Sequence, residues 1–558
     1  MRRPPRHVRL VAATAALAVL LAACSSGSSN KSAKDQKGST TGAAKQGGVF
    51  RLGIVEPTAI DPFNSQESEG ILVTKQLFTG LVEIDNATAQ IKPGVAEKWS
   101  HNTDCTEWTF NLRPGTKFSN GDPVDAQAFI RGMTRAAKQS AASDVAYHMA
   151  GIAGYTDIHG TGDANSKATA TTFSGLSAPD ANTLDVKLSA ADCEFDKKTL
   201  QPVMSPVPAS AGEAGNKVFN DMPIGNGPFK MKEPWHHDQS ITLVRNDSYF
   251  GAKAHLNEVD LTIQPGQDAL EAEYKGLQSG QYDYARIPPA LIPQAKSVYE
   301  PKGGFVHKLS YGINYLLVNV VNPPLNKADA RKAISLAIDR QAIIDGVFSG
   351  LQTRATSIIP PPLKDYYTPN VCDTCDKPDV TKAKQLAASA GLTPGTKVNL
   401  AFNTGGGHEA WVQAVQQQLE KNLGLKVNLQ PSPFAELLKN EKADNASGLF
   451  RAAWSADYPS AENFLFPLLS QKSLPPGDNR GRYVNKQFDD LLAQARKAAD
   501  ASQRVSLIKQ AEKIAIGDDM ALIPMWYRDQ YRAFDSSKLT GVDIDFFENP
   551  TLSTISLK

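Results

Sequence analysis

Two cysteines lie close together in the segment NVCDTCDKP, at Cys372 and Cys375. This spacing suits a local disulfide, half of a zinc site or a redox-active dithiol. Because no second metal-like pair and no neighbouring histidine accompanies it, the disulfide is favoured in an oxidising compartment. Cys105 and Cys193 would then pair by elimination. Cys105 precedes the strand-like run WTFNL and Cys193 follows TLDVKL, and antiparallel pairing of these runs would bring the two thiols together.

The fifth cysteine, Cys24, points to a membrane anchor. It follows a basic start, an apolar run over residues 10–21 and the small residues of LAA. The run is too short for a permanent membrane span, and a cysteine after small residues resembles the bacterial lipobox, where the thiol is lipidated and the chain is cut before it. We predict a signal peptide over 1–23. The alternative is cleavage at Ala-x-Ala with an incidental cysteine at this position.

Residues 25–46 (SSGSSNKSAKDQKGSTTGAAKQ) contain no large apolar side chain. Such a segment cannot bury enough surface to offset the entropy lost on ordering. We therefore predict that 24–46 comprises the lipidated Cys24 and a flexible tether. The body beyond it has no apolar stretch long enough to cross a bilayer, so we expect an extracytoplasmic protein anchored to the cell membrane through Cys24.

Charge and motifs exclude several function classes. Lysine and arginine total 59 against 58 for aspartate and glutamate, so no broad basic face for nucleic acid is expected. The chain has no HExxH, no GxSxG and no Gly-rich phosphate loop. The sequence predicts no enzyme, no cofactor and no metal site. Peptidase chemistry, or thiol oxidoreductase chemistry at Cys372 and Cys375, is the alternative.

The periodicity of the body predicts an α/β fold. A strand-like run at 398–402 leads through a glycine turn into a helix that ends before Gly424, and a second strand-like run follows at 427–429. This βαβ unit predicts two parallel strands with a right-handed crossover. Two further helices with apolar core faces are predicted around 488–495 and 507–515. At 558 residues, two or three lobes are expected.

Eight segments occur in the order of a known family. They are IDPFNSQESEGILVTKQLFTGLV (60–82), PGVAEKW (93–99), WTFNLRPGTKFSNGDPVDAQAF (108–129), MSPVP (204–208), NGPFKM (226–231), LQSGQYDYARIPP (277–289), VNPPLNKADARKAISLAIDRQAII (321–344) and RAAWSADYPSAENFL (451–465). With them the chain resembles the peptide and nickel class (family 5) of solute-binding proteins of ABC importers, and especially its oligopeptide-binding members.

The resemblance implies a fold, an activity and partners. The fold would be periplasmic-binding-protein-like type II, a Venus flytrap of three lobes with mixed sheets covered by helices. Lobe I would comprise 47–78, 205–309 and 528–558, lobe II 79–204, and lobe III 310–527, with two hinge crossings between lobes I and III. The protein would be a monomer that captures short peptides and delivers them to the permease. A metal chelate, haem or a modified signalling peptide is the alternative cargo.

The resemblance assigns the peptide's α-ammonium to Asp457, which lies in the segment WSADY with Trp454 and Tyr458 beside it. The alternative is that Asp457 caps a helix beginning near Ser460. The main chains of Ala453 and Ser455, and of the segment around Ser68 on the facing lobe, match positions that pair with the peptide backbone. Because every peptide offers the same backbone groups, this mode leaves side chains unread.

Four further residues match family positions around the ligand. Arg451 and His408 match charged residues that neutralise the ligand's carboxylate. The alternatives are a structural salt bridge for either residue and, for His408, capping of a helix N-terminus. Phe434 matches a pocket tryptophan, with core packing as the alternative. Gln66 replaces an acidic residue, so charge preference in that pocket is expected to differ.

Overall fold

The computed structural model describes residues 45–558 except 162–165, 265–268, 405–406 and 476. The predicted signal peptide, the lipidation site Cys24 and the tether up to residue 44 lie outside the described residues. The last two residues of the predicted tether contact the body: Lys45 forms a β-bridge with Leu557, and Gln46 Nε2 lies 2.7 Å from His255 Nδ1. Measured over this described part, every helix is too short or too polar to span a bilayer.

The first sheet has four strands in the order β1-β10-β9-β8. β1 (Val49–Ile54) pairs in parallel with β10 (Glu258–Ile263), and β9 (Ser240–Arg245) and β8 (Phe229–Met231) continue the sheet in antiparallel fashion. Helix α1 (Ser68–Leu77) shares a hydrophobic core with this sheet. Its first residue, Ser68, is exposed and lies at the helix N-terminus.

The second sheet lies entirely within the predicted lobe II and has the order β4-β5-β7-β6. Its strands are β4 (Ala96–His101), β5 (Glu107–Leu112), β7 (Thr183–Lys187) and β6 (Leu176–Asp180). Helix α2 (Ala126–Ala137) contributes to the core of this sheet. The predicted antiparallel pairing of WTFNL with TLDVKL is confirmed, because β5 pairs with β7 in this direction.

The third sheet has six strands in the order β11-β16-β12-β15-β13-β14. They are β11 (Tyr284–Arg286), β16 (Leu522–Phe534), β12 (Phe305–Val318), β15 (Leu449–Ser455), β13 (Lys397–Asn403) and β14 (Lys426–Ser432). Helix α11 (Glu409–Leu423) joins β13 to β14, which pair in parallel. The predicted βαβ unit is therefore confirmed, and Gly424 ends the helix in the left-handed conformation at φ 70°.

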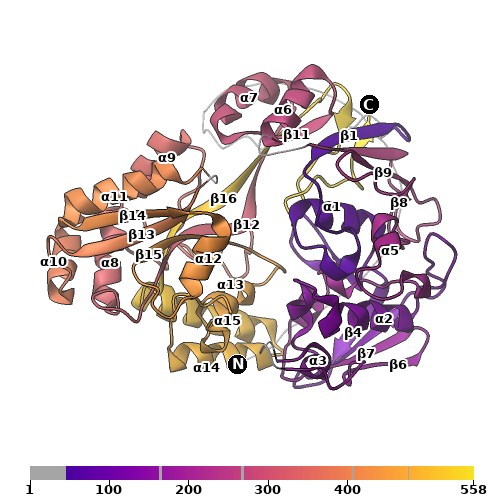
Figure 1. The fold of residues 1–558 in the computed structure, drawn as a ribbon, viewed down its shortest axis with the longest axis horizontal. Coiled ribbons are helices and arrows are strands. Elements are labelled where there is room, and N and C mark those ends of the chain that lie inside the picture. The colour runs from indigo at the N-terminus through magenta and orange to yellow at the C-terminus, as the bar shows by residue number, and fades with distance from the viewer. Residues whose placement is uncertain (1–44, 162–165, 265–268, 405–406, 476) are drawn as a thin grey trace, which may run out of the picture. The chain divides into compact units, whose positions relative to one another are not determined.

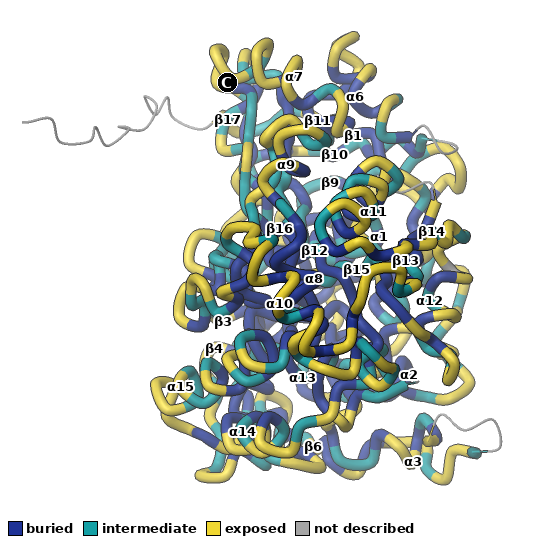
Figure 2. Tube along the Cα trace, turned by 90° about the vertical axis from the view of Figure 1, so that its left-hand side faces the viewer, coloured by how far each residue is buried: buried dark blue, intermediate teal, exposed yellow. Residues whose placement is uncertain are grey.

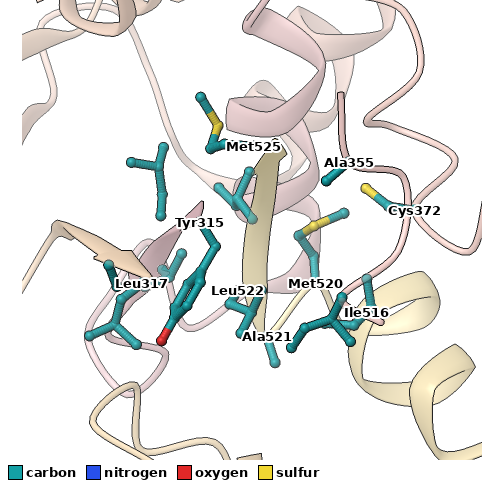
Figure 3. Close-up of a cluster of buried hydrophobic side chains, with 14 of the residues drawn as sticks. Tyr315, Leu317, Ala355, Cys372, Ile516, Met520, Ala521, Leu522 and Met525 are labelled. Carbon is teal, nitrogen blue, oxygen red and sulfur yellow. The ribbon is translucent and has the colours of Figure 1, made fainter. Parts of the chain in front are cut away.

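The core of this sheet is dense around β16 (Figure 3). Leu522 and Met525 of β16 pack with Tyr315 and Leu317 of β12, and Cys372 lies in the same buried cluster. The two predicted C-terminal helices are present as α14 (Lys486–Lys497) and α15 (Ala501–Glu512), and a π-helical turn (Lys513–Asp518) follows α15. Other helices of this part are α8 (Ala328–Ala337), α9 (Arg340–Phe348), α10 (Val380–Ala390), α12 (Phe434–Lys442) and α13 (Glu462–Leu469).

The remaining named elements are short. The helices are α3 (Tyr155–His159), α4 (Phe195–Lys198), α5 (Lys217–Asp221), α6 (Ala269–Ser279) and α7 (Ile292–Tyr299). The strands are β2 (Val82–Ile84) with β3 (Ile91–Pro93), and β17 (Leu539–Thr540) with β18 (Ser556–Leu557).

Strands β12 and β16 run side by side as a long antiparallel ribbon (Figure 1). The predicted lobe boundaries at 309/310 and 527/528 fall inside these two strands. Between the pairs Leu309↔Asp529 and Ile313↔Tyr527 the register shifts, so the ladder is interrupted at this level. Toward Val318 the residues of β12 are mostly buried, whereas its first five residues are at least partly exposed (Figure 2).

Both cysteine pairs of the body are joined by disulfides in the structure. Cys105 and Cys193 connect the loop before β5 to the segment before α4, with their Cα atoms 5.0 Å apart. Cys372 and Cys375 form a local bridge and are almost completely buried. Within the described residues, no group of three or more His, Cys, Asp or Glu side chains is arranged to hold a metal ion.

Candidate functional site

Strand β15 has an edge that is only partly paired. On one side it pairs with β12 along its whole length, and on the other side β13 pairs only with Leu449 and Phe450. Beyond Phe450 no described strand covers this second edge. A main-chain hydrogen bond of 2.8 Å from Ala456 N to Tyr311 O fixes the alternation, because residues two apart in a strand direct their main-chain groups to the same side. The N–H and C=O groups of Ala453 and Ser455 therefore point away from β12, toward the uncovered edge.

A cavity of about 280 Å³ lies at the end of this edge. It brings together four of the predicted site residues, which come from two distant stretches of the chain: Gln66, Ser68, Ser455 and Asp457. Asp144, Tyr147 and His148, from the predicted lobe II, also line it, so residues of all three predicted lobes contribute to this cavity. We call it the Asp457 cavity.

Asp457 is half-buried, and its carboxylate has a neutral partner. Its Oδ2 accepts a hydrogen bond of 3.0 Å from Asn463 Nδ2, and its backbone N donates to Asn463 Oδ1 at 2.8 Å. No basic side chain among the described residues forms an ion pair with it. The alternative role as a helix cap is wrong, because α13 begins at Glu462 and its N-cap residue is Ala461. The fold thus fixes Asp457 in place and leaves its negative charge unpaired.

Arg451 lies on the same strand, in a second cavity of about 300 Å³. Ala453, Trp454 and Phe434 line this Arg451 cavity too. Arg451 Nη1 donates to Asn403 Oδ1 at 3.3 Å. The predicted alternative of a salt bridge is absent from the part of the chain that the structure describes. Burial lowers the pKa of Arg451 from its usual value, so this cation occupies an unfavourable environment that an anionic ligand would improve.

Phe434 and His408 differ in exposure and in their contacts. Phe434 is 52% exposed, so its alternative role in core packing is wrong. His408 occupies the N-cap position of α11, yet its side chain makes no capping hydrogen bond, and its Nδ1 accepts from Trp411 Nε1 at 3.2 Å. Burial, reinforced by the charge of Arg451, lowers the pKa of His408 to about 4. At neutral pH the imidazole is therefore neutral and can donate one hydrogen bond; its contact with the ligand's carboxylate stays a prediction.

Trp454 and Tyr458 serve mainly to position the site. Trp454 Nε1 donates to Asn463 Oδ1 at 3.2 Å, the same oxygen that the backbone of Asp457 contacts. The Tyr458 hydroxyl donates to Glu462 in the protein interior. Both residues also line a third cavity, of about 490 Å³, which Asp457, Tyr147 and His148 line too.

Buried ionic contacts join the segment after Cys193 to the elements that carry Asp457. Glu194 accepts a hydrogen bond of 2.6 Å from Ser460 Oγ, and Gln201 Nε2 donates to the backbone oxygen of Asp457. Lys198 lies 3.7 Å from a carboxylate oxygen of Glu462. These contacts hold the predicted lobe II against the WSADY segment.

Sequence reasoning missed three charged residues of the site, Asp144, Arg528 and Glu548. Arg528 Nη1 donates to Ser455 Oγ at 2.7 Å, and its Nη2 lies 3.0 Å from Glu548 Oε2. Arg528 crosses directly over Gly312, where an added Cβ would lie 2.7 Å from its Cδ. Arg528 and Ser455 are 73 residues apart, and no local pattern in the sequence links them.

Comparisons with known proteins identify the family. The model for bacterial extracellular solute-binding proteins, family 5 Middle, matches residues 90–474. The oligopeptide-binding protein OppA of Bacillus subtilis (strain 168) is 31% identical over 509 residues, which cover 88% of each chain. The periplasmic oligopeptide-binding protein OppA of Salmonella typhimurium (strain LT2) is 31% identical over 487 residues, or 85% of each chain.

The solved structure of the Escherichia coli murein tripeptide binding protein MppA matches with a TM-score of 0.72 and 26% sequence identity, over 92% of this chain and 99% of that chain. This match confirms the predicted fold class, an α/β periplasmic-binding-protein-like fold of type II with mixed sheets covered by helices. The chain belongs to the bacterial extracellular solute-binding proteins of family 5.

Proposed function

We propose that this chain is the substrate-binding subunit of a bacterial ABC importer and that it captures short peptides outside the membrane for delivery to the permease. The observation that carries the proposal is the unpaired carboxylate of Asp457 at the end of an uncovered strand edge. A free peptide supplies what this arrangement lacks, since its ammonium pairs with the carboxylate and its amides satisfy the strand. The protein would bind and release its ligand unchanged and catalyse no reaction.

The ligand would lie along β15 as an added strand. The main-chain groups of Ala453 and Ser455 would bond its backbone, and its N-terminus would face Asp457 while its C-terminus faces Arg451. Asp457 lies six positions after Arg451, which at about 3.3 Å per residue is about 20 Å of extended chain. Since the Arg451 side chain can reach part of this distance, extended peptides of about three to five residues fit between the two charges.

We propose that the predicted lobes close on the ligand about the β12 and β16 ribbon. Lobe I (47–78, 205–309 and 528–558) would contribute the Ser68 side of the Asp457 cavity, lobe II (79–204) its outer wall, and lobe III (310–527) the Asp457 side. The register shift at the predicted boundary supports this placement, because it is where the ladder is weakest.

We also propose that the mature chain begins at Cys24 and is anchored there by lipid. A Cys24→Ser variant should lose incorporation of labelled fatty acid and should no longer fractionate with membranes. Retention on the membrane without lipid incorporation would contradict the anchor and leave the peptide-binding proposal unaffected.

Mass spectrometry of ligands released from gently purified protein tests the main proposal. We expect peptides of about three to five residues without a fixed sequence, and isothermal titration of the stripped protein should detect binding of trialanine. Release of haem or a metal chelate, with no binding of any unmodified peptide from two to six residues, would show that the cargo is not a peptide.

A further inference from the structure

The Asp457 cavity carries more negative than positive charge. Asp144, Asp457 and Glu548 line it, and Arg528 is its one arginine, with no lysine, among the described residues. His148 also lines the cavity, but burial lowers the pKa of its imidazole, which is therefore neutral near pH 7. At neutral pH three carboxylates thus face a single guanidinium group.

Two of these three carboxylates have no cationic partner. Glu548 is paired with Arg528 at 3.0 Å. Asp457 contacts the neutral amide of Asn463, and the proposed ligand uses its charge for the α-ammonium. One carboxylate, that of Asp144, is therefore left over after both other charges are matched.

The partners of Asp144 are neutral and hold it at the cavity wall. Its Oδ2 accepts hydrogen bonds from Asn64 Nδ2 at 3.3 Å and from Gln66 Nε2 at 3.2 Å, and its backbone N donates to Asn64 Oδ1 at 2.7 Å. These amides orient the carboxylate without neutralising it. Glutamine at position 66 thus supports a negative charge that a different predicted lobe contributes to the cavity.

Tyr147, three residues after Asp144, adds a second feature suited to a cation. Its side chain lines the same cavity, and the residue is 55% exposed. The face of an exposed tyrosine ring attracts ammonium and guanidinium groups. An aromatic ring and an unmatched carboxylate therefore meet on one wall.

We propose that Asp144 is a specificity residue that selects peptides with a basic side chain on their first residue, an inference that rests on the proposed function. The first side chain branches from the carbon that bears the α-ammonium, so in a ligand anchored at Asp457 it lies within reach of this cavity. Lysine or arginine at that position supplies the charge that Asp144 lacks. Later residues lie along β15 and away from Asp144.

Titration of the mature, ligand-stripped chain with Lys-Ala-Ala and norleucine-Ala-Ala tests this proposal, because the two peptides differ only in the terminal ammonium group of the first side chain. We expect the wild type to bind the lysine peptide about fivefold more tightly at low salt, as for a partly exposed ion pair. The preference should decrease as ionic strength rises. In Asp144→Asn the two peptides should bind equally.

Asp365→Asn is the matched control, because it removes the same charge from an exposed carboxylate that lines none of these cavities, and it should keep the wild-type preference. Gln66→Glu adds a carboxylate beside Asp144 and should raise the preference, which keeps the test valid if Asp144→Asn fails to fold. Equal binding by the wild type, an unchanged preference in Asp144→Asn, or no increase in Gln66→Glu would overturn the role of Asp144. If neither peptide binds the wild type, the proposed function itself fails.

Discussion

Replacing Asp457 by asparagine should weaken peptide binding by removing one charge and little else. Asparagine has the same size, and its oxygen can still accept the hydrogen bond from Asn463 Nδ2. An ammonium about 4 Å from a carboxylate gains about 4 kcal/mol at an effective dielectric constant of about 20, and desolvation of both ions offsets part of it. A hydrogen bond to a charged group contributes a net of about 1.5–3 kcal/mol. We therefore expect a loss of about 2–3 kcal/mol, or an increase in Kd of about 30- to 160-fold.

The assay compares trialanine with N-acetyl-trialanine by isothermal titration at pH 7. Acetylation removes the ammonium from the ligand, so the wild type should bind the acetylated peptide about as weakly as the Asp457→Asn variant binds trialanine. For the acetylated peptide, wild type and variant should differ little, because the charge pair is already absent. The four Kd values form a double-mutant cycle that isolates the ammonium–carboxylate interaction.

Two outcomes would refute this reasoning. If Asp457→Asn lowers the affinity for trialanine and for N-acetyl-trialanine by the same factor, the substitution has disturbed the cavity and the carboxylate does not contact the ammonium. If trialanine binds the variant as tightly as the wild type, the N-terminus lies elsewhere. Asp365→Asn again controls for a change in net charge, and thermal unfolding controls for damage to the fold.

Three further predictions concern stability and the wall of the site. Burial raises the pKa of Glu512 from its usual 4.5 to about 7, so the folded state retains a proton between these pH values and the free energy of unfolding falls as pH rises through them. Glu512→Gln should abolish this slope in denaturant titrations, and a persisting slope would contradict the account. Replacing both Cys105 and Cys193, which are 88 residues apart, by serine should lower the free energy of unfolding by about 4–5 kcal/mol, and reductant should then act only through the remaining Cys372–Cys375 bridge. Gly312→Ala should displace Arg528 and raise the Kd for trialanine, measured by isothermal titration, about three- to tenfold. An unchanged Kd would show that the position of Arg528 does not matter for binding.

Local patterns in the sequence predicted much of the fold. The periodic apolar face of α11 predicted that this segment is a helix, and the glycine after it predicted where the helix ends. The turn before the helix predicted that the two flanking strands are parallel. The eight ordered segments extended this to the fold class of the whole chain. The pairing of β5 with β7 also followed from short alternating runs, because register is set by which side chains must be buried.

The charge state and partners of the site could not be predicted in the same way. Burial and the charge of Arg451, a residue distant in sequence, lower the pKa of His408, and a motif match says nothing about desolvation. Arg528 reaches Ser455 only because a glycine, Gly312, lies between them. Asp144 lies on a different predicted lobe from Asp457, so only the assembled cavity places the two carboxylates together.

The ribbon of β12 and β16 has a mechanical consequence for ligand release. A paired two-stranded ladder resists stretching, because every hydrogen bond would have to break, but it tolerates a wide range of twist. For the lobe closure proposed above, the expected motion is therefore a twist of this ribbon, unlike motion on a flexible glycine linker. Compliance should concentrate between Leu309 and Ile313, where the register shifts, and amides there should exchange with deuterium faster than those on either side.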